Sequence, residues 1–235
     1  MTPVIERAFV LGAGLGTRLH PLTKNLPKPL VQVQGRPLVT HGLDHLAAIG
    51  VREAIINTHH AHERWKEAFP QNEYRKIKLT FRHEPVLLDT GGGIKNVEDF
   101  FANQETFLIY NGDILTSLPL EKGLAHHRKK KNLVTMVLRS TAEPRHVCMN
   151  SKGRVTDIRG TLKKDSSPQY LFTGIHIVEP ELFRHIPRIE VKSIISIYLD
   201  LIRQGLPIGG VVLDEGNWSD IGTLDEYERI NRVSA

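Results

Sequence analysis

One stretch decides the fold of this chain: Ala8-Phe9-Val10-Leu11-Gly12-Ala13-Gly14-Leu15-Gly16-Thr17-Arg18. Its first four residues are apolar and are typical of a short buried strand. Three glycines follow at alternate positions, and glycine lets a ligand approach the backbone closely because it has no Cβ. Consecutive backbone N–H groups in such a turn form a concavity that binds anions. The stretch therefore predicts a strand that ends in a phosphate-binding loop.

Two cations accompany this loop, and both suit phosphate. Arg18 directly follows the glycines, and a guanidinium can form two parallel hydrogen bonds to a phosphate. Lys28 lies ten residues later and supplies a compact positive charge. Pro27 and Pro29 stiffen the backbone around Lys28, since proline fixes its own φ and restricts the residue before it. We expect both cations to contact a nucleotide triphosphate.

Two common nucleotide-binding loops do not match this pattern. A dinucleotide loop has the spacing G-x-G-x-x-G and an acidic residue at the end of the second strand, whereas the second strand here, 53–58, is followed by two histidines. A Walker loop closes with Gly-Lys-Ser/Thr, but Gly16 is followed by Thr17 and Arg18. A plain strand-to-helix turn is one alternative. The functional alternative is a nucleotide-phosphate loop of another kind.

Strands and helices alternate through the first 139 residues. Expected strands are 8–11, 53–58, 78–82, 106–110 and 133–139, and expected helices are 38–49, 61–69, 94–101 and 120–130. Segment 84–93, which ends in Thr-Gly-Gly-Gly, is predicted to be a loop. The alternation indicates an α/β fold with a Rossmann-like, mostly parallel sheet and helices on both faces. Ligands bind beyond the carboxyl ends of such strands, where the glycine loop and Asp113 both lie.

The pattern changes after Ser140, where antiparallel strands are expected to join the sheet. The expected elements are a hairpin of 147–150 with 154–159, strands 170–178 and 208–213, and helices 193–204 and 223–233. No linker or repeat interrupts the chain. We therefore predict a single domain, 1–235, with a nucleotide-binding half at about 1–139 and a second half at about 140–235.

Composition and charge exclude several classes of protein. The 235 residues are 40% hydrophobic, as in a globular domain, and contain no apolar run of membrane-spanning length. The first residues lack a signal-peptide pattern, so we expect a cytoplasmic protein with no membrane partner. A single cysteine, Cys148, excludes an internal disulfide. The net charge of +5 favours anionic partners, but the basic run 128–131 has no interleaved aromatic residues, so we predict no nucleic-acid partner.

Longer motifs resemble one enzyme family. Residues 11–30, L-G-A-G-L-G-T-R-L-x-P-L-T-x-x-x-P-K-P-L, are similar to the signature of the sugar-1-phosphate nucleotidyltransferases, which have a nucleotide-diphospho-sugar transferase fold. The resemblance continues through Gly35-Arg36-Pro37-Leu38, Asp89-Thr90-Gly91-Gly92-Gly93-Ile94, Asn111-Gly112-Asp113, Phe172-Thr173-Gly174-Ile175 and Trp218-Ser219-Asp220-Ile221-Gly222-Thr223. The subgroup it most resembles contains short enzymes like mannose-1-phosphate guanylyltransferase and N-acetylmuramate-1-phosphate uridylyltransferase. One departure is Gly12, where alanine is usual, and we expect it only to widen the space beside the base.

The resemblance implies a reaction and its substrates. An oxygen of a sugar 1-phosphate attacks the α-phosphorus of an NTP, and pyrophosphate leaves in line. Arg18 is expected to meet the β- and γ-phosphates, and Lys28 the α-phosphate or the incoming phosphate. Backbone N–H groups of 12–17 are expected to hold the base edge and the phosphates. The implied nucleotide-binding residues are Leu11, Gly12, Ala13, Gly14, Gly16, Thr17, Arg18, Glu84 and Gly91.

The resemblance also implies a magnesium site and a sugar pocket. Asp113 and Asp220 match the metal ligands of the family, and Mg²⁺ prefers one or two carboxylates together with phosphate oxygens and water. The alternatives are a turn aspartate for Asp113 and a helix cap for Asp220. The half 140–235 is expected to bind the sugar. The residues expected around the sugar phosphate are Asn111, Arg145, Thr173, Gly174 and Lys192.

Glu84 is the position expected to select the base. Its carboxylate can accept two hydrogen bonds from guanine or one from uracil, and it fits adenine worse; an ordinary surface role is the alternative. GTP with a mannose- or heptose-type sugar is favoured over UTP with an amino sugar, and CTP stays open. A choline-phosphate-type cytidylyltransferase and a non-catalytic nucleotide-sugar sensor are the rival functions, and the presence of both aspartates favours a catalyst. The sequence gives no indication of oligomeric state.

Overall fold

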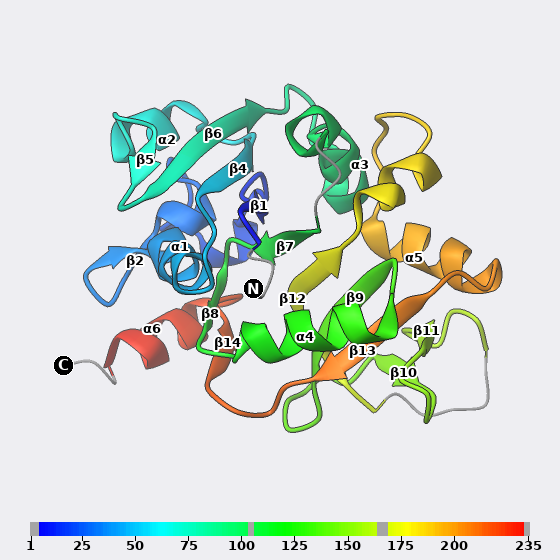
Figure 1. Cartoon of the computed structure of the whole chain (residues 1–235). Coiled ribbons are helices and arrows are strands. Elements are labelled where there is room, and N and C mark those ends of the chain that lie inside the picture. The colour runs from blue at the N-terminus through cyan, green and yellow to red at the C-terminus, as the bar shows by residue number, and fades with distance from the viewer. Residues whose placement is uncertain (1–4, 103–105, 164–168, 233–235) are drawn as a thin grey trace. The chain divides into compact units, whose positions relative to one another are not determined.

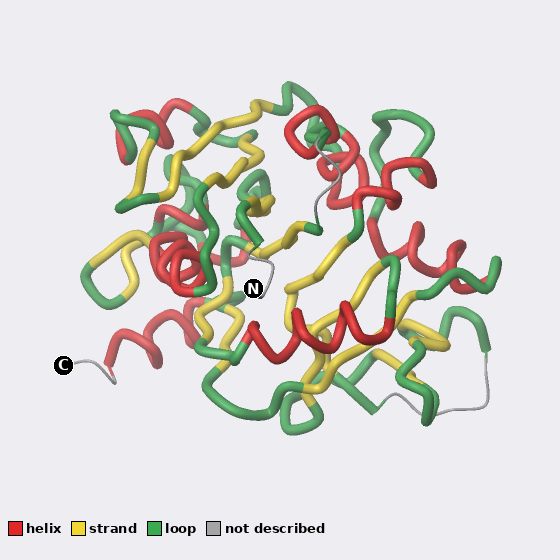
Figure 2. The backbone as a smooth tube through the Cα atoms, viewed as in Figure 1, coloured by secondary structure: helices red, strands yellow, loops and turns green. Residues whose placement is uncertain are grey.

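The computed structural model describes residues 5–102, 106–163 and 169–232 (Figures 1 and 2). The chain divides into two compact units, which are described separately. Unit 1 comprises Met1–Leu87, Tyr110–Ser117 and Asn217–Ala235, and unit 2 comprises Leu88–Ile109 and Leu118–Gly216. The expected single domain with two functional halves stays a prediction.

Unit 1 contains a mostly parallel sheet whose central strand is β4. Its strands are β1 (Arg7–Leu11), β4 (Glu53–Thr58), β6 (Ile77–His83) and the short antiparallel edge strand β5 (Glu73–Tyr74). In register, β4 places Asn57 opposite Leu11 of β1 and opposite Arg82 of β6. Parallel strands end at the same edge of a sheet, so the glycine loop after β1 begins beside the last residues of β4.

Helices and short elements complete unit 1. The helices are α1 (Leu38–Ala48), α2 (Glu63–Ala68), α6 (Leu224–Arg232) and the 3₁₀ turns η1 (Thr17–Leu19) and η2 (Lys28–Leu30). Two antiparallel strand pairs are β2 (Gln32–Val33) with β3 (Arg36–Pro37), and β8 (Ile114–Thr116) with β14 (Trp218–Asp220). One apolar cluster joins η1, β2, α1 and α6 through Leu19, Val33, Leu38 and Ile230, so the loop after β1 is anchored in the core.

Unit 2 is a mixed sheet covered on both faces. Its strands are β9 (Val134–Arg139), β12 (Leu171–Val178) antiparallel to β9, β13 (Ile208–Val212) parallel to β9, and the hairpin of β10 (Val147–Met149) with β11 (Val155–Ile158). Its helices are α3 (Asp89–Lys95), α4 (Leu120–Lys130), α5 (Ile194–Arg203) and the 3₁₀ turns η3 (Glu98–Phe101) and η4 (Pro180–His185). Strand β7 (Phe107–Asn111) begins in unit 2 and ends in unit 1.

Two neighbouring residues of β12 show which helices cover the two faces of the unit 2 sheet. Ile177 lies against Gly123 of α4, whereas His176 shares a hydrogen bond with Tyr198 of α5. Adjacent residues of a strand point to opposite faces, so α4 and α5 cover the two faces of this sheet. None of the helices formed by the described residues has the length and apolar character needed to cross a membrane.

The expected elements are mostly present, with one clear error. Segment 84–93 was expected to be a loop and 94–101 a helix, but α3 begins at Asp89, includes the three glycines and ends at Lys95. The backbone N–H groups of Gly91 and Gly92 donate to the Lys192 carbonyl at 2.8 and 3.1 Å. An added Cβ at Gly92 would lie 2.0 Å from the Glu190 carbonyl oxygen. Tertiary packing thus outweighs the poor helix propensity of glycine. Val233, the last residue of the final predicted helix, lies outside the described residues.

Candidate active site

A lysine and two aspartates meet in unit 1. Lys28 opens η2, and only 8% of the residue is exposed. Its Nζ donates a hydrogen bond to Asp113 Oδ2 at 2.7 Å and lies 3.6 Å from Asp220 Oδ1. Lysine is almost never buried without a charged partner, and these two carboxylates are its partners. The structure therefore brings together three of the four residues for which the sequence predicts the reaction chemistry.

Pairing of β8 with β14 creates this arrangement. Ile114 is opposite Asp220 in the antiparallel register, and the N–H of Ile221 donates to the Asp113 carbonyl at 3.2 Å. The two aspartates therefore lie side by side although they are far apart in the sequence. Asp220 belongs to a strand, and it is the Thr223 hydroxyl that accepts from the N–H of Glu226 in α6, at 3.3 Å. The alternative of a helix cap for Asp220 is wrong.

Arg18 lies near Asp220, and both contact the space beside Gly222. A Cβ added to Gly222 would meet Arg18 Nη1 at 3.3 Å and Asp220 Oδ2 at 3.4 Å, so this glycine lies against both groups. Partial burial raises the pKa of the Asp220 carboxyl, and the negative charge of Asp113 raises it further. The positive charges of Lys28 and Arg18 act in the opposite direction on the pKa of Asp220. The four groups thus form one electrostatic cluster of two cations and two acids.

The glycine loop is tied to this cluster at several points. The N–H of Gly112, just before Asp113, donates to the Leu11 carbonyl at 3.0 Å. Gly16 has a positive φ of 64°, which glycine adopts without the penalty of a side chain. The Thr23 hydroxyl donates to the Gly16 carbonyl at 2.7 Å, and a Cβ at Gly16 would lie 3.1 Å from Lys28 Cβ. Thr23, which sequence reasoning left out, is therefore a support of the loop.

Asn57 and Glu84 lie beneath the start of the loop. The N–H of Gly12 donates to Asn57 Oδ1 at 2.8 Å, and Asn57 Nδ2 donates to Glu84 Oε1 at 2.8 Å. Glu84 is 1% exposed, so the alternative of an ordinary surface residue is wrong and its carboxylate is enclosed by protein. In this structure the N–H of Gly12 is engaged by Asn57, and the nucleotide-binding role of Gly12 stays a prediction. Asn57 was missed as a site residue, although a polar residue at the carboxyl end of a buried strand is a recognisable signal.

The reason for glycine at position 12 also differs from the expectation. A Cβ there would lie 2.8 Å from the Asn57 carbonyl oxygen, 2.9 Å from Ile56 Cγ2 and 2.9 Å from Trp65 Cζ2. The protein itself fills the volume that a methyl group would need, and Trp65 of α2 is 1% exposed. Gly12 therefore does not widen the space beside a base. It lets α2 pack closely on the end of β1.

The donor set of the cluster fits the predicted magnesium ion. Asp220 ends β14, and Asp113 directly precedes β8, the strand paired with β14. Mg²⁺ is commonly held by one or two carboxylates, with phosphate oxygens and water as its other ligands. Among the described residues, no group of three or more His, Cys, Asp or Glu side chains is placed to hold a metal. A site that relies on two carboxylates and a substrate phosphate agrees with both facts.

The residues predicted for the sugar phosphate are spread over both units. Asn111 ends β7 in unit 1. In unit 2, the hydroxyl of the buried Thr173 donates to the Val137 carbonyl at 2.8 Å, and Gly174 has a φ of 84°. Arg145 Nε lies 3.0 Å from Glu143 Oε1. Lys192 accepts the Gly91 N–H through its carbonyl, and its Nζ lies 4.0 Å from Asp200 Oδ2. Their roles, and those of the remaining loop residues Leu11, Ala13, Gly14 and Thr17, stay predictions.

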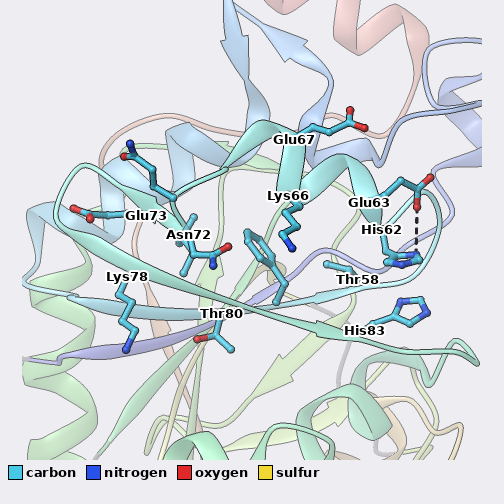
Figure 3. Close-up of a pocket in the computed structure, with 13 residues that line it drawn as sticks. Thr58, His62, Glu63, Lys66, Glu67, Asn72, Glu73, Lys78, Thr80 and His83 are labelled. Atoms are coloured by element: carbon cyan, nitrogen blue, oxygen red, sulfur yellow. Dashed lines mark ion pairs between the residues drawn. The ribbon is translucent and has the colours of Figure 1, made fainter.

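A concave region of unit 1 lies between α2 and β6 and contains none of the predicted site residues (Figure 3). Its volume is about 1120 Å³. His62 and His83 stack there with ring centroids 4.0 Å apart, and His62 Nδ1 lies 3.3 Å from Glu63 Oε2 (Figure 3). Basic and acidic side chains of similar number line this region, so its charge does not select a phosphate ligand.

Comparison with known proteins places the chain in a family. Residues 7–235 match the nucleotidyl transferase family, and the chain belongs to it. A mannose-1-phosphate guanylyltransferase of Mycobacterium tuberculosis is 30% identical over 226 residues, which are 94% of this chain and 62% of that protein. A UTP–glucose-1-phosphate uridylyltransferase of Synechocystis is 26% identical over 240 residues, with 94% and 61% covered. The chain thus spans about three fifths of the length of these relatives.

Solved structures show the same fold. The inositol-1-phosphate CTP transferase of T. maritima superposes with a TM-score of 0.81 at 17% identity, over 99% of this chain and 98% of that one. The predicted fold class, a mostly parallel α/β sheet of the nucleotide-diphospho-sugar transferase type, is confirmed. The resemblance to the sugar-1-phosphate nucleotidyltransferases is confirmed as well.

Proposed function

We propose that this chain transfers a nucleotidyl group from an NTP to a sugar 1-phosphate, with an NDP-sugar and pyrophosphate as products. One observation carries the proposal: Lys28 lies between Asp113 and Asp220, 2.7 Å and 3.6 Å away, at the foot of a glycine loop that ends in Arg18. The relatives named mannose-1-phosphate guanylyltransferase and UTP–glucose-1-phosphate uridylyltransferase support it.

The reaction needs positioning and charge neutralisation more than covalent help. A phosphate oxygen of the sugar 1-phosphate forms a bond to the α-phosphorus, and the bond from that phosphorus to the β-phosphate oxygen breaks. Arg18 binds the β- and γ-phosphates and stabilises the leaving pyrophosphate. Lys28 holds the α-phosphate, where negative charge increases in the transition state. The backbone of the glycine loop keeps side chains away from the phosphates.

Asp113 and Asp220 would hold Mg²⁺ together with the phosphates. The ion, when bound, supplies positive charge to the phosphate oxygens. The pairing of β8 with β14 brings the two carboxylates side by side. Burial and then the negative charge of Asp113 raise the pKa of Asp220, and a bound cation would relieve the repulsion between the two acids. Lys28 and Arg18 set the direction from which the phosphates approach.

GTP with a mannose- or heptose-type sugar is the substrate pair we favour. The guanylyltransferase of M. tuberculosis, at 30% identity, supports GTP over the UTP of the Synechocystis relative at 26%. The T. maritima neighbour, named for CTP and inositol 1-phosphate, shows that the fold accepts other pairs. The substrate grid described below separates these pairs.

Pyrophosphate release across a grid of substrates tests the proposal. The chain is assayed with GTP, UTP, CTP and ATP against mannose, glucose and N-acetylglucosamine 1-phosphates and phosphocholine, with and without Mg²⁺. One sugar 1-phosphate should dominate, and turnover should require the metal. Asp113→Asn and Lys28→Met should each lower kcat by about 100-fold or more, as expected for a group that stabilises transition-state charge.

A matched control and two contrary outcomes complete the test. Lys95→Met removes a lysine that is also largely buried and also paired with an acid, Glu98, and it should leave turnover unchanged. Turnover with phosphocholine and no sugar phosphate would show a cytidylyltransferase instead. Nucleotide binding without pyrophosphate release from any pair would show a sensor.

A further inference from the structure

Asn57 connects two segments that the predicted nucleotide site depends on. It occupies the end of β4, the strand between β1 and β6, and is 3% exposed. Its Oδ1 accepts from the N–H of Gly12 at 2.8 Å, and its Nδ2 donates to Glu84 Oε1 at 2.8 Å. Gly12 is the first residue after β1, and Glu84 is the first after β6. One amide therefore joins the ends of three adjacent strands.

The chemistry of this bridge requires an amide at position 57. The Gly12 N–H can only donate, and Glu84 Oε1 accepts, so the middle group must accept on one side and donate on the other. Asparagine does both with neighbouring atoms. A buried donor or acceptor that loses its partner costs about 1–3 kcal/mol, and a charged one costs more. Hydrogen-bond donation therefore runs from the Gly12 N–H to Asn57 and from Asn57 to Glu84.

The backbone of Glu84 is held as firmly as its side chain. Its N–H donates to the Thr58 carbonyl at 2.8 Å, and its carbonyl oxygen lies 2.7 Å from His59 Nδ1. With 1% exposure, the carboxylate is enclosed by protein and directed at Asn57. An enclosed carboxylate in this position affects a bound ligand indirectly, by holding Asn57 and, through it, the glycine loop.

We propose that Glu84 and Asn57 act as positioning residues, and that they bind nucleotide through the glycine loop rather than by contact with the base. The hydrogen-bonded bridge of Glu84 and Asn57 holds the first peptide of the loop in place. This orients the backbone N–H groups that follow it and Arg18. Its loss weakens binding of the triphosphate group, whatever base is attached. This inference rests on the proposed function, in which the loop binds an NTP.

Exchange of the two side chains tests the bridge directly. Asn57→Asp sets two buried carboxylates against each other, and it should weaken binding of GTP, UTP and inorganic tripolyphosphate alike, by about tenfold or more. Glu84→Gln keeps an acceptor for Asn57 and should change these Kd values by less than about threefold. In Asn57→Asp with Glu84→Gln, the introduced amide can donate to the introduced carboxylate, which still accepts from Gly12. This double variant should recover binding to within about threefold of the wild type.

Calorimetric Kd values with each ligand distinguish the outcomes. Asn132→Asp is the matched control, because Asn132 is also 3% exposed and also bridges two partners, Thr135 at 2.9 Å and Arg154 at 3.0 Å. It should leave nucleotide binding unchanged. A change of more than about tenfold in the GTP-to-UTP ratio of Kd values in Glu84→Gln would show direct base contact and overturn the inference. A double variant that binds no better than Asn57→Asp would also overturn it.

Failure of the proposed function gives a different result. A wild-type chain that binds nucleotide but releases no pyrophosphate refutes nucleotidyl transfer, and the exchange experiment still decides the bridge because it measures binding alone. A wild-type chain that binds neither nucleotides nor tripolyphosphate refutes both. Circular dichroism of each variant confirms that the compared proteins are folded.

Discussion

Replacement of Gly12 by alanine should destabilise the fold, although alanine is the residue that the family pattern usually has there. The added methyl would lie 2.8 Å from the Asn57 carbonyl oxygen and 2.9 Å from both Ile56 Cγ2 and Trp65 Cζ2. Carbon atoms in good contact lie about 3.5–4.0 Å apart, so each neighbour would have to retreat by more than about 0.5 Å. The carbonyl belongs to the central strand β4, and Ile56 and Trp65 are 0% and 1% exposed, so none of them can retreat into solvent.

The size of the effect follows from two opposing contributions. Insertion of a methyl into a packed core costs about 1–3 kcal/mol, and three simultaneous close contacts favour the upper half of that range. Loss of glycine's freedom in the unfolded chain returns about 0.4–1 kcal/mol. The net loss should be about 1–2.6 kcal/mol, which for a chain of this size lowers Tm by about 2–10 °C.

Thermal unfolding followed by circular dichroism measures this change, with Gly14→Ala as the control. Gly14 lies in the same loop, has no heavy atom within 4 Å of an added Cβ and has no positive φ. Its variant should be as stable as the wild type or slightly more stable. Trp65→Phe removes the contacting ring carbon, so its combination with Gly12→Ala should lose less stability than the sum of the single changes. Equal Tm values for Gly12→Ala and Gly14→Ala would refute the reasoning.

Two further predictions concern unit 2. Burial lowers the pKa of His176 from 6.5 to about 3, so between these pH values the unfolded chain binds a proton that the native chain does not. The free energy of unfolding should therefore fall by up to about 1.4 kcal/mol per pH unit below pH 6.5. The variant His176→Asn keeps an acceptor for the Tyr198 hydroxyl and should flatten the pH profile of urea unfolding. An equally steep profile in this variant would contradict the prediction. Gly92→Ala should destabilise more than Gly12→Ala, because its Cβ would lie 2.0 Å from the Glu190 carbonyl oxygen, and a smaller fall in Tm would exclude that packing constraint.

Elements with a strong local signal were predictable from the sequence. Helix α4 occupies the predicted 120–130, and α5 follows Ser193, whose hydroxyl accepts from the Ile195 N–H at 3.3 Å as an N-terminal cap. Strand β1 and the glycine loop were recognisable because an apolar run leads directly into residues with no Cβ. In each case, the pattern that determines the element lies within the element itself.

Elements created by distant partners were not predictable in the same way. Strands β8 and β14 have three residues each and exist because they pair with each other across about half the chain, so neither has enough length for a periodic pattern. Helix α3 contains three glycines because segment 190–194 packs against it. Asn57 was not predicted to be a site residue, because its two partners lie 45 and 27 residues away in the sequence.

The cluster around Lys28 has a balanced charge, and this bears on how a nucleotide would bind. Two cationic side chains, Arg18 and Lys28, are matched by two acidic ones, Asp113 and Asp220, and Lys28 is already engaged by both acids. The group therefore has no surplus positive charge with which to attract a polyanion. If a triphosphate binds here together with a divalent cation, an ion held by the aspartates would compete with Lys28 for them and would free the lysine ammonium to contact the phosphates.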